Sequence, residues 1–154
     1  MRVLLAIDDS KFSRAAMQAV IDRALPKDAE VRVLHVLTPI RPLTGEMGAQ
    51  IGDTIALEEA QLTRAKELVD EVAQRLRVAR LNVSTAVEEG DPKTKIIDHA
   101  AQWHADLIVL GSHGLRGINR FLLGSVSEAV ARHASCSVEI VRVPAPVAAV
   151  EKAA

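Results

Sequence analysis

The chain has 154 residues, a length typical of one domain that can bury a core without disulfides or metals. Apolar residues make up 49% and charged residues 25%, which excludes a disordered chain, a collagen-like chain and a disulfide scaffold. The formal net charge is −1, and the aromatic residues are two Phe and one Trp, which argues against nucleic-acid binding through a basic surface or base stacking.

The N-terminus and the single cysteine bear on the compartment in which the protein works. The first apolar run, Val3–Ile7, is followed at once by two aspartates, so it is too short for the core of a signal peptide. No uncharged apolar run approaches the roughly 18 residues that a membrane-spanning helix needs. Cys136 has no second cysteine with which to form an intrachain disulfide. We therefore expect a cytoplasmic soluble protein with no membrane contact.

Five short apolar runs alternate with longer segments of helical periodicity. Several of these runs are apolar at nearly every position, as in strands of a parallel sheet that helices cover on both faces. The repeated alternation of strand and helix predicts an α/β domain with a doubly wound parallel sheet. The predicted strands are Val3–Ile7, Val31–Leu37, Leu81–Val87, Leu107–Leu110 and Val138–Val143.

The predicted helices begin at recognisable capping residues. Ser10 is a suitable N-cap for a helix over Lys11–Ala24, and the proline that follows blocks its continuation. Asp91 precedes a proline at the first helical position, which is a strong start signal. The last helix is expected near Ser125, because Ser125-Val126-Ser127-Glu128 has the pattern of a capping box.

The longest predicted helix runs from Asp53 or Thr54 to about Val78. Its charged face is expected to be solvated, and Glu71 and Arg75 have the spacing of an i,i+4 ion pair.

Two segments lack a predicted element. The proline- and glycine-rich segment Thr38–Gly52 is expected to be a long loop over the carboxyl edge of the sheet, and loops of this length are often functional. Residues 144–154 are expected to form a frayed tail behind a single domain over residues 1–143.

The segment after the fourth predicted strand carries the most informative pattern. Gly111 and Gly114 flank a tight turn, and Gly124-Ser125 stands directly before a helix. Glycines allow backbone amides to approach a ligand closely, and a helix N-terminus offers unpaired N–H groups that suit phosphate. These residues alone therefore indicate an anion site, although the glycines could also serve only the loop and Ser125 only the cap.

Several common nucleotide and catalytic motifs are absent from the sequence. The chain has no G-x-x-x-x-G-K-[ST] loop, and its spaced glycines do not form the G-x-G-x-x-G pattern of dinucleotide binders. No G-x-S-x-G nucleophile elbow occurs, and no nucleophile with an adjacent base can be assembled. The histidines show no metal-ligand spacing with Cys136.

These features together resemble the universal stress protein family. The spacing Gly111-x2-Gly114-x9-Gly124-Ser125 is similar to the ATP-binding signature of that family. Asp8 at the end of the first predicted strand, with Ser10 opening the first helix, resembles the family's N-terminal motif. Leu34-His35-Val36 and the segment 105–114 also resemble it, and the resemblance spans residues 2–143.

The resemblance implies a flavodoxin-like five-stranded sheet of strand order 3-2-1-4-5 and a site for ATP with Mg²⁺. It implies that Asp8 contacts the ribose and that Ile7, Val36 and Leu110 line the adenine pocket. The residues that it implies for holding the ribose and phosphates are Gly111, His113, Gly114, Gly124, Ser125, Val126 and Ser127. Many members have a proline just before the fifth strand, where this chain has Cys136-Ser137, a departure that leaves the nucleotide motif intact.

Asp8 and His113 each have a second interpretation. Asp8 could simply cap the helix that follows, although the glycine motif favours a contact with ribose. His113 is expected to contact a ligand through its backbone, since a lone histidine without a partner base or acid is seldom catalytic.

The function that we expect is an ATP-binding stress-response protein whose nucleotide state alters a dimer or a partner contact. The last predicted strand, Val138–Val143, would be a sheet edge, and the resemblance implies a homodimer through it. One alternative is a homodimeric interaction module that binds no nucleotide, and another is a slow ATP hydrolase. A nucleotidyl transferase is disfavoured, because neither an H-I-G-H nor an S-G-G-x-D-S signature occurs.

Overall fold

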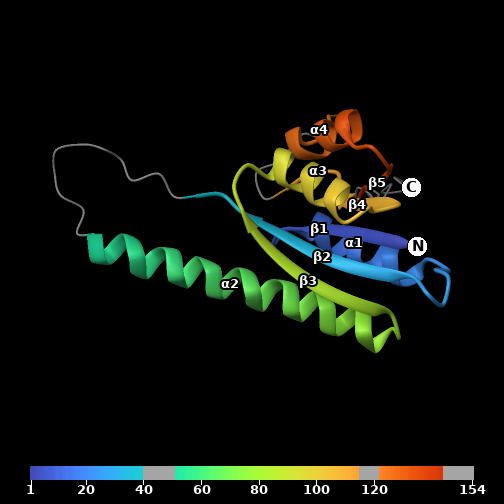
Figure 1. The fold of residues 1–154 in the computed structure, drawn as a ribbon, viewed down its shortest axis with the longest axis horizontal. Coiled ribbons are helices and arrows are strands. Elements are labelled where there is room, and N and C mark those ends of the chain that lie inside the picture. The colour runs from blue at the N-terminus through green and yellow to red at the C-terminus, as the bar shows by residue number, and fades with distance from the viewer. Residues whose placement is uncertain (40–50, 115–121, 144–154) are drawn as a thin grey trace, which may run out of the picture.

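Five parallel strands form one sheet in the order β3-β2-β1-β4-β5 (Figure 1). The structure is a computed structural model that describes residues 1–39, 51–114 and 122–143, with the backbone alone at 51–54. The expected α/β class and strand order are thereby confirmed. The strands are β1 (Arg2–Ile7), β2 (Glu30–Leu37), β3 (Asn82–Glu89), β4 (Leu107–Gly111) and β5 (Ser137–Val141).

Two pairs of helices cover the two faces of this sheet. Helices α1 and α2 pack on one face, and α3 and α4 pack on the other (Figure 1). No helix within the described ranges is both long and apolar enough to cross a membrane. The four helices of the described residues are α1 (Lys11–Asp22), α2 (Ile51–Val78), α3 (Pro92–Gln102) and α4 (Ser125–His133).

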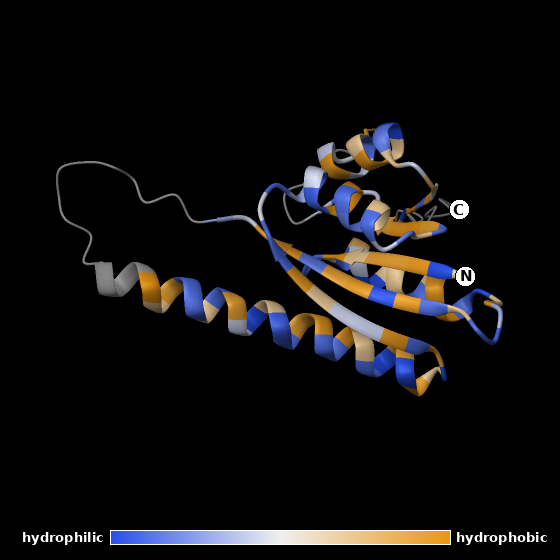
Figure 2. Ribbon diagram, in the orientation of Figure 1, coloured by the Kyte–Doolittle hydropathy of each residue, from blue (hydrophilic) through white to orange (hydrophobic). Residues whose placement is uncertain are grey.

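Strand β1 lies at the centre of the sheet and is buried on both faces. Val3, Leu5 and Ile7 pack in the cluster under α1 and α2, whereas Leu4 and Ala6 pack in the cluster under α3 and α4. Successive side chains of a strand point to opposite faces, so a strand covered on both sides must be apolar at every position. Figure 2 shows this hydrophobic run along β1, broken only near its start.

Two of the predicted N-caps are confirmed. The Ser10 side chain accepts a hydrogen bond from the backbone N–H of Ser13 at 3.2 Å, and α1 starts at the next residue after Ser10. The Asp91 carboxylate accepts from the backbone N–H of Thr94 at 3.2 Å and caps α3, with Pro92 as its first residue. Each cap satisfies an N–H group that would otherwise lack a partner in the first turn.

The predicted capping box at α4 is wrong. Gly124 is the N-cap, and Ser125 is already the first helical residue, so its hydroxyl cannot cap the turn. The helix makes no side-chain cap hydrogen bond at this end. The helix itself starts at Ser125, as expected, and the backbone N–H of its N-cap Gly124 donates to the carbonyl of Ser112 at 2.8 Å.

Helix α2 begins earlier than the sequence predicted, at Ile51 instead of Asp53 or Thr54. It runs along β2 and β3 and continues past the ends of these strands (Figure 1). Ile55 and Leu57 in this N-terminal part are each 51% exposed. The expected loop therefore ends before Ile51, and its residues 40–50 lie outside the described residues, as does the expected tail at 144–154.

The packing of α2 on the sheet yields a stability prediction. Leu76 is 0% exposed and lies in the cluster under α1 and α2, whereas Val78 on the same helix is 80% exposed. We expect Leu76→Ala to lower the free energy of unfolding by about 2–5 kcal/mol, since it removes buried contacts and leaves a cavity. Val78→Ala should change it by less than about 0.5 kcal/mol. Urea denaturation of both variants checks this, and equal losses would contradict the assigned packing.

Candidate functional site

The topology brings the ends of β1 and β4 together at the carboxyl edge of the sheet. The two strands are neighbours, with Ala6 paired to Leu110 in the register. The chain leaves β1 into α1 on one face and leaves β4 toward α4 on the other face. Connections that diverge in this way open a crevice at the strand ends, which is where doubly wound sheets bind ligands.

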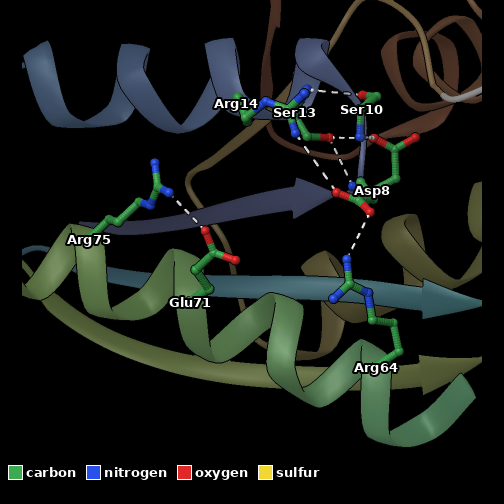
Figure 3. Close-up of polar contacts among 8 residues, drawn as sticks. Asp8, Ser10, Ser13, Arg14, Arg64, Glu71 and Arg75 are labelled. Atoms are coloured by element: carbon green, nitrogen blue, oxygen red, sulfur yellow. Dashed lines mark hydrogen bonds and ion pairs between the residues drawn. The ribbon is translucent and has the colours of Figure 1, made fainter. Parts of the chain in front are cut away.

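Asp8 follows β1 directly and is fixed by the first turn of α1 (Figure 3). Its Oδ1 accepts hydrogen bonds from the Ser10 backbone N–H at 3.1 Å and from the Ser13 hydroxyl at 2.6 Å. Its own backbone N–H donates to the Ser13 Oγ at 2.8 Å. The side chain is half-buried, so the carboxylate is held in one orientation at the edge of the sheet.

Gly114 lies against this carboxylate from the other loop. A Cβ at Gly114 would stand 2.8 Å from the Oδ2 of Asp8, closer than real Cβ contacts. Two residues far apart in the sequence, one after β1 and one after β4, thus meet at the carboxyl edge of the sheet. The absence of a side chain at Gly114 lets the carboxylate and the loop backbone approach each other.

Gly111 has a packing role that the sequence did not reveal. A Cβ at this position would lie 2.6 Å from the Cβ of Phe12 and 2.8 Å from the Phe12 carbonyl carbon. The first turn of α1 therefore rests directly on the end of β4. Gly111 is buried and serves the contact between these two elements.

Gly124 and Ser127 join the N-terminus of α4 to the loop after β4. The Ser112 carbonyl accepts from the Gly124 N–H at 2.8 Å and from the Ser127 hydroxyl at 2.9 Å. The Ser127 hydroxyl also lies 2.9 Å from the Gly124 carbonyl, and the residue is 2% exposed. The Ser127 side chain therefore faces the protein, which leaves the first-turn N–H groups of Ser125, Val126 and Ser127 as the donors suited to an anion.

The three apolar residues expected around adenine do not share one face of the sheet. Val36 and Leu110 both belong to the cluster under α3 and α4. Ile7 belongs to the cluster under α1 and α2, on the opposite face, and is 6% exposed. The structure thus brings Val36 and Leu110 to one side of the sheet and separates Ile7 from them.

His113 lies between Gly111 and Gly114 in the chain and packs against Phe12 of α1. Its ring centroid is 5.1 Å from that of Phe12, and its Nδ1 is 3.1 Å from the Ser112 Oγ. Its Nε2 is enclosed and has no hydrogen-bond partner among the described residues. The side chain is half-buried, so it supports the loop that carries Gly114.

Asp9 turns away from Asp8 and toward the helices. Its carboxylate lies 3.8 Å from the Arg14 guanidinium of α1 and 3.2 Å from the Arg64 guanidinium of α2. Behind Asp9 lies an open cleft of about 350 Å³, lined on the sheet side by His35 and Leu37 and otherwise mainly by α2. Of the glycines that the structure describes after β4, Gly111, Gly114 and Gly124 do not line this cleft.

Sequence reasoning missed Ser13, Ser112 and the part that Phe12 plays. The signal for Ser13 was its place in the first turn of α1, from which a hydroxyl can reach back to the residue before the N-cap. No sequence pattern pointed to Ser112, because it acts through its backbone carbonyl, a group that every residue has. The predicted Glu71–Arg75 ion pair is confirmed, with 2.8 Å between its charged atoms.

Two titratable groups away from the crevice have pKa values that neighbouring residues or burial shift. Burial and the nearby Asp106 carboxylate raise the pKa of the Cys136 thiol, which disfavours a reactive thiolate. A hydrogen bond from His99 holds the pKa of Glu88 below its usual value and links α3 to β3. No group of three His, Cys, Asp or Glu side chains in the described part of the chain could hold a metal ion.

The position of Gly111 yields a second prediction. We expect Gly111→Ala to lower the free energy of unfolding by about 1–3 kcal/mol, because the added methyl group is forced against the Phe12 backbone. Gly114→Ala is the matched control with a smaller expected loss, since its methyl group meets the Asp8 side chain and no described backbone atom. Thermal denaturation of the two variants separates the roles, and equal melting temperatures would contradict the packing role of Gly111.

Known proteins are similar to this chain in sequence and in fold. The sequence model of the Universal stress protein family matches residues 1–142. The chain is 32% identical over 150 residues to the Universal stress protein Sll1388 of Synechocystis sp., covering 92% of this chain and 97% of that protein. Universal stress protein UspA from Lactobacillus plantarum has a similar structure, with 27% identity, a TM-score of 0.76, and coverage of 92% and 97%.

A further solved structure is a universal stress protein in complex with cAMP. It aligns at 25% identity with a TM-score of 0.64, covering 92% of this chain and 96% of that one. With a family match that spans all five strands and relatives that are covered almost completely, the chain belongs to the universal stress protein family.

Proposed function

We propose that the protein binds an adenine nucleotide across the carboxyl edge of its sheet. The ribose lies at Asp8, and the phosphates lie over the turn at Gly111–Gly114 and the N-terminus of α4. The observation that carries this proposal is the close approach of the Asp8 carboxylate to Gly114. A hydrogen-bond acceptor and a backbone segment without a side chain lie next to each other there. The cAMP complex of a family member supports adenine as the base.

The chemistry of this edge suits a phosphorylated ribose. A carboxylate accepts hydrogen bonds from sugar hydroxyls, and the N–H groups of a helix N-terminus donate to phosphate oxygens. Val36 and Leu110 offer apolar surface for a base on the α3 and α4 side. Mg²⁺ fits the proposal as an ion that the phosphates bring, since magnesium in such sites keeps several waters and takes few protein ligands.

The proposed ligand is ATP, and the proposed role is regulation by occupancy rather than rapid turnover. Efficient phosphoryl transfer needs a positioned base, metal ligands and a cation at the transferred phosphate. Among the described residues of the crevice, the Asp8 carboxylate bonds to Ser10 and Ser13 and the His113 ring to Ser112, so these two side chains do not form an acid–base pair. Slow ATP hydrolysis is the alternative, whereas an interaction module without nucleotide does not explain the close approach of Asp8 and Gly114.

Calorimetry with ATP and Mg²⁺ tests the nucleotide site. We expect saturable binding of one ATP per chain. Asp8→Ala should weaken ATP binding about tenfold, the effect of losing one charge-assisted hydrogen bond, while binding of adenine alone should not change. Gly114→Val should abolish ATP binding, because its branched side chain would collide with the Asp8 carboxylate.

Asp9→Ala is the matched control for the Asp8 variant. It removes a neighbouring carboxylate that is paired with Arg14 and Arg64, so ATP binding should persist. Absence of detectable heat at millimolar ATP with the natural protein would refute the site. A steady-state hydrolysis rate above about 1 s⁻¹, the low end for ordinary enzymes, would favour the enzyme alternative.

We also infer a homodimer through the edge strand β5. Both β3 and β5 are edges of the sheet. Both edges leave valines or isoleucine half-buried, namely Val83 and Val87 in β3 and Val138 and Ile140 in β5, but β3 also exposes four polar residues whereas β5 exposes Ser137 alone. An edge with partly uncovered β-branched residues favours pairing with a second copy across a two-fold axis.

The register of β5 identifies the backbone groups available for this pairing. The Val141 carbonyl accepts from the Ser112 N–H at 2.8 Å, so Val141 directs its backbone groups toward β4. Backbone groups alternate sides along a strand, so Ile140 directs its own away from β4.

We expect Ile140→Pro to yield a monomer, because proline removes an outward N–H donor. Ile140→Ala is the control, since it removes the same side chain and keeps that donor. Sedimentation at tens of micromolar measures both variants, with circular dichroism to confirm folding. A monomeric natural protein, or a dimer that survives Ile140→Pro, would contradict the inferred interface.

A further inference from the structure

The Ser13 hydroxyl connects the backbone and the carboxylate of the same residue. Its Oγ lies 2.8 Å from the Asp8 backbone nitrogen and 2.6 Å from the Asp8 Oδ1. The backbone N–H can only donate, so Oγ accepts that bond. The single proton of the hydroxyl is then directed to the carboxylate, which can only accept when ionised. Figure 3 shows both bonds meeting at Ser13.

Ser13 itself is held in place by the fold. It is 6% exposed and lies in the first turn of α1, where its backbone N–H donates to the Ser10 Oγ at 3.2 Å. The Ser10 backbone N–H also donates to Oδ1 of Asp8, at 3.1 Å. Two donors at the start of α1 therefore hydrogen-bond to the same carboxylate oxygen.

These two hydrogen bonds help to orient the second carboxylate oxygen of Asp8. With Oδ1 bound to Ser10 and Ser13, Oδ2 is the oxygen that faces Gly114, 2.8 Å from the place where a Cβ would stand. A side chain that lost one of the two donors could rotate about its Cα–Cβ and Cβ–Cγ bonds. The Ser13 hydroxyl thus contributes to the direction of Oδ2 at the crevice.

We propose that Ser13 is a positioning residue that sets the selectivity of the site for nucleotides with ribose hydroxyls. The inference rests on the proposed nucleotide site and adds a determinant of its ligand class. Ser13 orients the Asp8 carboxylate so that it accepts hydrogen bonds from the ribose hydroxyls. Among the described residues the Ser13 hydroxyl bonds to Asp8, and not to the loop after β4 or to α4, so we expect Ser13 to affect recognition of the sugar and not of the phosphates.

The test compares ATP with 2′,3′-dideoxy-ATP, which lacks both ribose hydroxyls. The natural protein should bind ATP more tightly, because only ATP offers the hydroxyls to Asp8. Ser13→Ala should weaken ATP binding about tenfold, the effect of losing one charge-assisted hydrogen bond to the recognising group, and leave dideoxy-ATP binding unchanged. Calorimetry of the full chain with Mg²⁺ and each nucleotide measures the ratio of the two dissociation constants.

Val20→Ala is the control for a purely structural role. Val20 lies in the same helix as Ser13 and is fully buried in the cluster under α1 and α2, so its truncation should lower the melting temperature of the protein. Its apolar side chain cannot hydrogen-bond to Asp8 or Ser13, so the ratio of the two dissociation constants should stay as in the natural protein. Selectivity and stability thus separate in the two α1 variants.

A double-mutant cycle with Asp8→Ala completes the test. If Ser13 acts only through Asp8, adding Ser13→Ala to Asp8→Ala should cause no further loss of ATP binding. Additive losses, or an equal weakening of both nucleotides by Ser13→Ala, would overturn the positioning role while leaving the nucleotide site in place. Failure of the natural protein to bind either nucleotide would overturn the nucleotide site and this inference with it.

Discussion

The burial of β1 on both faces is the constraint on which the rest of the structure depends. Val3, Leu5 and Ile7 are covered by α1 and α2, and Leu4 and Ala6 are covered by α3 and α4. The buried part of this strand, Val3–Ile7, tolerates no polar side chain, since an unpaired polar group there would lose its hydration. Asp8, directly after Ile7, is the first position of the chain where a charged group can reach the edge of the sheet.

The glycines after β4 serve the fold and the site in different ways. Gly111 admits the first turn of α1 onto the end of β4, and Gly124 admits the Ser112 carbonyl to the N-terminus of α4. Of these three glycines, Gly114 is the one that faces the Asp8 carboxylate. The same three residues that suggest a ligand loop therefore also hold two helices against the sheet, and a substitution at each has a different physical consequence.

The adjacent residues Asp8 and Asp9 point in different directions and have different roles. Asp8 is turned inward and takes donors from the fixed start of α1. Asp9 is turned outward to Arg14 and Arg64, and its side chain is 51% exposed. Exposed ion pairs of this kind contribute little to stability, so Asp9 links α1 and α2 only weakly. The strong and directed interactions at this edge are those of Asp8.

The sequence by itself determined the features that depend on local patterns. Runs of apolar residues revealed the buried strands, and the caps at Ser10 and Asp91 could be recognised because a cap involves groups only two or three residues apart. The family resemblance supplied the strand order and the pairing of Asp8 with the glycine segment, which periodicity alone does not contain.

Only the tertiary structure decided the features that depend on contacts between distant segments. Gly124, and not Ser125, is the N-cap of α4, and its backbone N–H bonds to Ser112 in the loop after β4. Ile7 lies on the opposite face of the sheet from Val36 and Leu110, because strand register fixes which face each side chain takes. The roles of Gly111 and Ser13 likewise follow from how α1 rests against the ends of β1 and β4. A local pattern reports on neighbours in the chain, whereas these positions are set by groups that folding brings together from separate strands and helices.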